Sequence, residues 1–137
     1  MTSRSTACPS WSTSFFSIVP IVSVNVIGVI GTPTAADTYA IGRDFPRIAE
    51  IQLQSSGDGR FTLATVALGD GGQFMHWLRG PGGEWSQLTR YEDAVTVVRF
   101  GLDGRLYLLS KKAASRGQLL RVSLAEPVLA KARVVSP

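Results

Sequence analysis

Cysteine and histidine are nearly absent from this sequence, whose 137 residues include one of each, Cys8 and His76. A single cysteine excludes an internal disulfide, and the chain has too few such residues for a zinc knuckle or a Cys-x-x-Cys redox site. No histidine or second cysteine lies near Cys8 in the sequence to lower the pKa of its thiol, so we interpret it as inert. We predict neither a metal nor a cofactor.

Charge is also sparse. Charged residues make up 18% of the chain, and the net charge of +4 comes from lysines and arginines that are scattered and form no basic run. A nucleic-acid-binding tail or a polybasic membrane anchor would contain such a run. We therefore expect no nucleic-acid partner.

Sustained helical periodicity is missing as well. From Ile48 onward no 3.6-residue pattern of apolar positions lasts more than two turns. The 14 glycines and 7 prolines favour many turns, while a hydrophobic fraction of 45% is typical of a globular protein. These features predict an all-β fold.

What the chain does contain is a series of short apolar strands separated by turn signals. Asp58 and Gly59 form one such signal and Asp103 and Gly104 another. Asp-Gly between apolar runs is typical of a hairpin, because the turn needs positive φ angles that Gly adopts freely and Asp tolerates. The expected strands are residues 48–53, 61–68, 73–79, 85–89, 94–100, 105–110 and 118–124.

A repeat of 45 residues relates these strands. Residues 58–63, DGRFTL, reappear as residues 103–108, DGRLYL, and the same offset places residues 86–89 on 131–134, where it implies an eighth strand. A period of about 40 to 50 residues with four strands is the size of one β-propeller blade. The alternative is two unrelated hairpins that share a common turn.

A blade cannot cover its own apolar faces, because each sheet packs against its neighbours around the propeller axis. Two blades do not close a ring. The repeat therefore implies partners: further blades, a complementary chain, or an identical copy that associates through the exposed blades.

Short motifs along these strands carry a family resemblance. They include GRDFPRIAE at residues 42–50, GDGG at residues 69–72 and LYLLS at residues 106–110. In their order and spacing the chain resembles, from Gly31 to Pro137, the propeller domain of the prolyl oligopeptidase family of serine peptidases. The resemblance implies about two four-stranded blades of a seven-bladed propeller, which caps an α/β-hydrolase domain, admits short peptides and excludes folded proteins.

The catalytic part of that family has no counterpart here. Its hydrolase domain carries the serine nucleophile on a glycine-rich elbow, and no Gly-x-Ser-x-Gly occurs in this chain. A lone histidine cannot make a triad, and His76 shares a strand face with Phe74 and Leu78, so we interpret it as a packing residue. We predict no catalytic residue.

The expected function is accordingly that of a propeller fragment, inactive alone, from a serine endopeptidase that acts on short proline-containing peptides. The partners that this implies are the remaining blades, the hydrolase domain and, in the parent enzyme, the peptides. The alternative is a free-standing binding or scaffold module, which an export signal would send out of the cell.

Phe45 is the one candidate for substrate contact. It resembles a position from which the family's propeller projects an aromatic ring toward the peptide cavity. A Phe beside Pro46 at the start of a strand is also a common core anchor.

Lysines and aspartates in the turns suggest no site. We interpret Lys111 and Lys112 as solvated loop charges. Asp58, Asp70 and Asp103 each stand beside glycine and lack the alternating oxygen ligands of a calcium loop, so they are turn formers.

Residues 1–30 do not resemble the family, and we expect them to form a non-homologous or disordered leader, with residues 31–137 as the partial propeller. The apolar stretch at residues 15–30, followed by Thr34, Ala35 and Ala36, resembles a secretory signal peptide, although Pro20 and Asn25 interrupt it. A truncated or frameshifted reading frame would also explain it. The first reading predicts export and the second a cytoplasmic protein.

Overall fold

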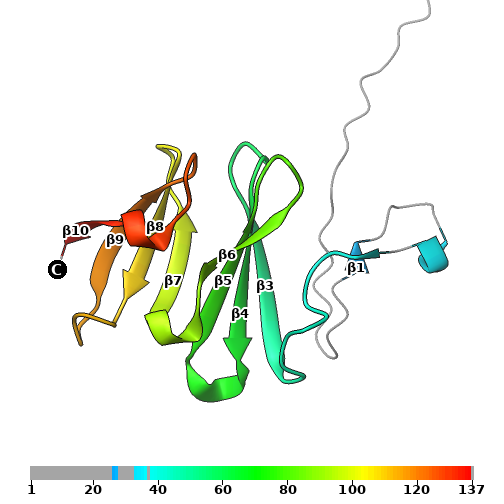
Figure 1. The fold of residues 1–137 in the computed structure, drawn as a ribbon, viewed down its shortest axis with the longest axis horizontal. Helices are drawn as coiled ribbons and strands as arrows, with labels where there is room; N and C mark the ends of the chain where they lie inside the picture. The colour runs from blue at the N-terminus through cyan, green and yellow to red at the C-terminus, as the bar shows by residue number, and fades with distance from the viewer. Residues whose placement is uncertain (1–25, 28–32, 37, 137) are drawn as a thin grey trace, which may run out of the picture.

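The computed structural model describes residues 26–27, 33–36 and 38–136. Within them the fold is all-β, with two four-stranded antiparallel sheets joined in series (Figure 1). The first sheet has the order β3-β4-β5-β6, with β3 at Ala49–Ser55, β4 at Thr62–Leu68, β5 at Phe74–Arg79 and β6 at Trp85–Thr89. The second has the order β10-β9-β8-β7, with β7 at Val95–Phe100, β8 at Arg105–Ser110, β9 at Gln118–Ser123 and β10 at Arg133–Ser136.

All eight strands expected from the sequence are present, each within two residues of its predicted bounds. In the two Asp-Gly turns the glycines take the predicted positive φ, 69° at Gly59 and 71° at Gly104. The prediction was wrong for Asp58 and Asp103, since Ala94 is the one non-glycine residue with positive φ among the described residues. The described residues also form four single-turn 3-10 helices: η1 at Thr34–Ala36, η2 at Gly69–Gly71, η3 at Tyr91–Asp93 and η4 at Leu129–Lys131. The all-β prediction and the two four-stranded sheets are thus confirmed.

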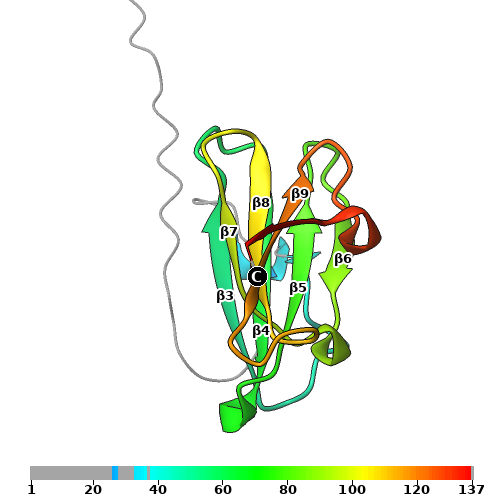
Figure 2. The same ribbon diagram turned by 90° about the vertical axis from the view of Figure 1, so that its left-hand side faces the viewer.

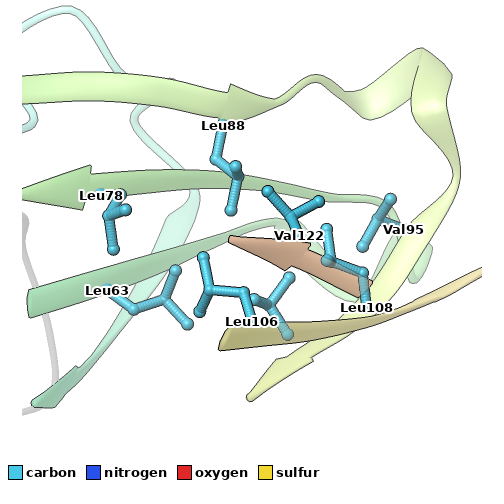
Figure 3. Close-up of a cluster of buried hydrophobic side chains, with 8 residues drawn as sticks. Leu63, Leu78, Leu88, Val95, Leu106, Leu108 and Val122 are labelled. Atoms are coloured by element: carbon cyan, nitrogen blue, oxygen red, sulfur yellow. The ribbon is translucent and has the colours of Figure 1, made fainter. Parts of the chain in front are cut away.

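The core lies between the two sheets, which stack face to face (Figure 3). Both sheets contribute side chains that are almost wholly buried: Leu63, Leu78, Leu88, Val95, Val98, Leu106, Leu108 and Val122. Burying a Leu or Val side chain contributes about 1.5 to 3 kcal/mol. Neither sheet could bury this face alone, so the two form one packing unit.

The 45-residue repeat does not hold side chain by side chain, because the two equivalent turns differ in length. Ser55 pairs with Thr62 across six residues in the first sheet, whereas Phe100 pairs with Leu106 across five in the second. Since side chains alternate along a strand, one extra residue exchanges the two faces of the strand that follows. Leu63 therefore faces the second sheet, while Leu108, its counterpart at the 45-residue offset, faces back toward the first.

One short connection joins the sheets, at residues 90–94. It holds η3, where the Arg90 backbone N–H donates to the Asp93 carboxylate at 3.0 Å, and ends at Ala94 with a left-handed φ of 49°. The second sheet fastens it, because the Lys111 N–H donates to the Ala94 carbonyl at 2.9 Å and the Ser110 hydroxyl donates to the Asp93 carbonyl at 2.9 Å.

Of the predicted leader, the structure describes only β1 at Val26–Ile27, which pairs antiparallel with β2 at Thr38–Tyr39. The other residues of the leader, including most of the apolar stretch and Cys8, lie outside the described residues. The boundary between leader and propeller near residue 30 stays a prediction. In the part of the chain that the structure describes, no helix has the length and apolar character needed to cross a membrane.

Candidate functional site

Phe45 lies in the segment that precedes the first sheet, and this segment packs near the sheet face that points away from the second sheet. A turn positions the ring: the Phe45 N–H donates to the Gly42 carbonyl at 3.2 Å, and Gly42 has a φ of 108°, which favours glycine. The rings of Phe45 and Trp77 are 5.9 Å apart between centroids and tilted by 42°. That spacing and tilt suit an aromatic pair.

An open hollow of about 850 Å³ adjoins this pair. Its lining residues are Thr38, Ala40, Ile41, Gly42, Arg43, Asp44, Phe45, Met75 and Trp77. The indole Nε1 of Trp77 is buried and has no hydrogen-bond partner among the described residues. Because that atom is buried, what the hollow offers is an aromatic and apolar wall, which can hold an apolar group.

Phe45 is half-buried against Trp77. This contact fits a core anchor, and its role as a substrate contact stays a prediction. Trp77 was not singled out from the sequence, although strand alternation places it on the face opposite His76. What the sequence could not indicate is which distant segment covers that face.

Replacing Phe45 with alanine is expected to lower the free energy of unfolding by about 2 kcal/mol, because the half-buried ring and its pairing with Trp77 are both lost. Phe45→Leu keeps most of the apolar contact, so about 1 kcal/mol is expected for that control. Urea unfolding followed by tryptophan fluorescence measures both. An alanine variant as stable as the original protein would show that the ring anchors nothing and would favour the substrate-contact reading.

The single histidine lies between the sheets. His76 is fully buried, and its Nδ1 is 2.7 Å from the hydroxyl oxygen of Thr89, which is 1% exposed. Burial lowers the pKa of His76 from 6.5 to about 4. An imidazole beside a hydroxyl is the start of a nucleophile–base pair, but substrate cannot reach these two buried groups. The interpretation of His76 as a packing residue is confirmed.

Lys111 and Lys112 are both exposed, as predicted, and Lys112 has a partner. Its ammonium is 2.9 Å from the Asp93 carboxylate, on the connection between the sheets. Burial raises the pKa of Asp93, but the hydrogen bond from the Arg90 backbone and the Lys112 ammonium together outweigh it, so this pKa lies below its usual value. The ion pair between Lys112 and Asp93 stabilises the connection between the sheets. Because the two charges neutralise each other, the pair does not suggest a ligand site.

The three aspartates in the turns, Asp58, Asp70 and Asp103, have local structural roles. Asp58 accepts hydrogen bonds from the Ser56 hydroxyl at 2.6 Å and the Arg60 N–H at 3.1 Å, and the Ser56 bond is the main reason for its lowered pKa. Asp103 pairs with Arg105 at 2.9 Å, and Asp70 lies in η2. Among the described residues, no three His, Cys, Asp or Glu side chains gather closely enough to hold a metal ion.

Solved structures of two peptidases contain a similar arrangement of strands. The chain is similar to a prolyl endopeptidase, from a structural and mechanistic analysis of two such enzymes, with a TM-score of 0.64 and 22% identity over 82% of this chain. It is also similar to oligopeptidase B from Trypanosoma brucei with covalently bound antipain, with a TM-score of 0.64 and 18% identity over 82% of this chain.

In both cases the match covers 16% of the other protein, so the chain spans a small part of its length. No family model matches the sequence. No curated protein matches it either. The resemblance expected from the sequence is thus confirmed as a likeness of fold to a fragment of these peptidases.

Proposed function

We propose that the chain is part of a seven-bladed β-propeller belonging to a serine peptidase of the prolyl oligopeptidase type. In such an enzyme the propeller limits access to short proline-containing peptides, and the catalytic serine resides in an α/β-hydrolase domain. Alone, the two sheets are inactive. Their partners are the remaining blades and the hydrolase domain.

The observation that carries this proposal is the order of the strands in space. Two successive four-stranded antiparallel sheets, each built from consecutive strands, stack face to face through an apolar core. Successive stacked sheets of this kind are the building plan of a propeller. The likeness to prolyl endopeptidase and oligopeptidase B supports the assignment to peptidases of this type.

Phe45 is the residue that we propose for contact with peptide in the assembled enzyme. It borders an open hollow that its neighbour Trp77 also lines. A peptide offers apolar side chains that match such an aromatic wall.

The full chain is expected to show no hydrolysis of a chromogenic prolyl peptide and no labelling by a fluorophosphonate. A serine hydroxyl is a poor nucleophile without a neighbouring base and an oriented third group, and the only histidine is buried at Thr89. Mass spectrometry after labelling measures the second outcome, with an active prolyl endopeptidase as the positive control. Labelling of any serine would contradict the proposed inactivity.

The assignment to a larger peptidase is tested by the DNA that follows the coding region, read in all three frames. Further four-stranded repeats and then a serine elbow would support it. A region without them would favour a second function, a free-standing scaffold that assembles through its outer faces, where Leu53 and Val97 are exposed. Light scattering would then reveal an oligomer.

We propose a cytoplasmic location for the peptidase fragment. The scaffold would instead be exported, with the apolar stretch at residues 15–30 as its signal.

A further inference from the structure

The second sheet has an outward face that no described residue of the first sheet covers (Figure 2). Because Val98, Leu108 and Val122 point into the core, their alternating neighbours along β7, β8 and β9 point outward. One row of outward positions is apolar and consists of Val97, Leu109 and Leu119, which are partners in register across the three strands. Val97 is 39% exposed.

The adjacent row is cationic. In register across the four strands it consists of Arg99, Tyr107, Arg121 and Arg133. Arg99 bends toward the first sheet, where its guanidinium donates to the side-chain carbonyl of Gln54 at 3.3 Å. Arg121 and Arg133 remain, side by side on β9 and β10.

The positive charges of Arg121 and Arg133 repel each other in this structure. Like charges directly opposite one another on neighbouring strands repel, and within the described residues neither guanidinium has a hydrogen-bond or ion-pair partner. A cation on an edge strand discourages unwanted strand pairing, which would account for Arg133 on β10. It does not account for Arg121, which is half-buried on the inner strand β9.

The corresponding face of the first sheet differs in this respect. There the matching row is Gln54, Leu63, Leu78 and Ser86, which are partners across β3 to β6, and the second sheet covers Leu63 and Leu78. A row that packs against an apolar sheet is thus uncharged in this protein. Two unpaired guanidinium groups at the equivalent place indicate a covering surface of a different chemistry.

We propose that the outward face of the second sheet docks a polypeptide surface that places a carboxylate between Arg121 and Arg133 and apolar side chains on Val97, Leu109 and Leu119. Guanidinium groups bind carboxylates through paired, charge-assisted hydrogen bonds, and one carboxylate between two of them removes the repulsion. The apolar row supplies the burial that an ion pair alone lacks. The inference rests on the two-sheet fold, and in the propeller of the proposed function the docked surface belongs to the next blade.

A second copy of this chain that docked its β3 strand on this face would not supply the carboxylate. The open face of the first sheet presents Ala49, Ile51, Leu53 and Ser55 along β3, and none of them carries a carboxylate. Nucleic acid is also a poor occupant, since its affinity comes from many phosphate contacts and this face has two unpaired cations beside an apolar row.

Binding of the full chain to a fluorescent glutamate–tyrosine copolymer, measured by anisotropy, tests this proposal. We expect the Arg121→Gln/Arg133→Gln variant to bind at least about tenfold more weakly, because two charge-assisted contacts are lost. The matched control is Arg60→Gln/Arg90→Gln, which removes the same charge from two exposed positions elsewhere and should change the affinity by less than about twofold.

Three results would overturn the proposal: no binding of the copolymer by the original protein, an equal loss in the control variant, or equally tight binding of a single-stranded oligonucleotide through the same two arginines. Thermal unfolding separates docking from folding. Since the substitutions relieve a repulsion, the double variant should unfold at the same temperature as the original protein or higher. A marked loss of stability would show that the arginines are structural and would likewise refute the docking role.

Discussion

Leu106→Ala is expected to lower the free energy of unfolding by about 2 to 5 kcal/mol. Leu106 is fully buried between the two sheets, where its side chain belongs to the cluster that holds them together. Alanine removes the apolar contacts and leaves a cavity that the two rigid sheets can close only in part. Chemical denaturation monitored by circular dichroism measures the loss.

The chain provides a matched control four residues away. Leu102 lies in the turn between β7 and β8 and is fully exposed, so Leu102→Ala should change the stability by less than about 0.5 kcal/mol. Since domains are stable by only about 5 to 15 kcal/mol, the Leu106 variant is expected to lose a large share of its stability and to melt at a lower temperature than the Leu102 variant. Equal stabilities for the two variants would mean that the sheets do not dock in solution.

Acidification is expected to destabilise the protein through His76. Its pKa is 6.5 when unfolded and about 4 when folded, because burial disfavours the charged ring. The unfolded chain therefore binds more protons between these values. Stability from this group is complete above pH 6.5, falls as the pH drops, and levels off below about pH 4. At about 1.4 kcal/mol per pKa unit, the loss reaches about 3 kcal/mol.

The His76→Leu/Thr89→Val variant removes the titrating ring and its hydroxyl partner together, so that neither is left buried and unpaired. Urea midpoints measured across this pH range should then stay flat, whereas those of the original protein should decline. The pKa values of Asp58, Asp93 and Asp103 are lowered, so their loss of stability begins only below about pH 4. A decline in the variant equal to that of the original protein would exclude His76 as the cause.

The strands could be predicted from the sequence because their signals are local. Alternating apolar residues mark the strands, and glycines that take positive φ at residues 59 and 104 mark two of the hairpins, without reference to the rest of the chain. Register depends on turn length as well. The six-residue and five-residue turns look alike in sequence, since both contain Asp-Gly-Arg, and only the paired strands reveal that Leu63 and Leu108 face opposite directions.

The candidate site was less predictable, because it depends on contacts between distant segments. Phe45 was chosen from a family resemblance, and its contact with Trp77 joins residues 32 positions apart. The left-handed backbone at Ala94 also lacked a sequence signal, since alanine seldom adopts it. The contacts of Ser110 and Lys111 with the connection hold this conformation.

The connection at residues 90–94 is short, and its length affects how much intrinsic affinity the two sheets need in order to stay packed together. A tether of five residues holds one sheet near the other at an effective concentration of about millimolar or higher, so an interface of modest intrinsic affinity stays closed. The outward face of the second sheet gains the same advantage from a neighbour joined by an equally short link. A neighbour on a separate chain must bind at its free concentration, and the carboxylate contact to Arg121 and Arg133 would then have to supply affinity that a tether otherwise replaces.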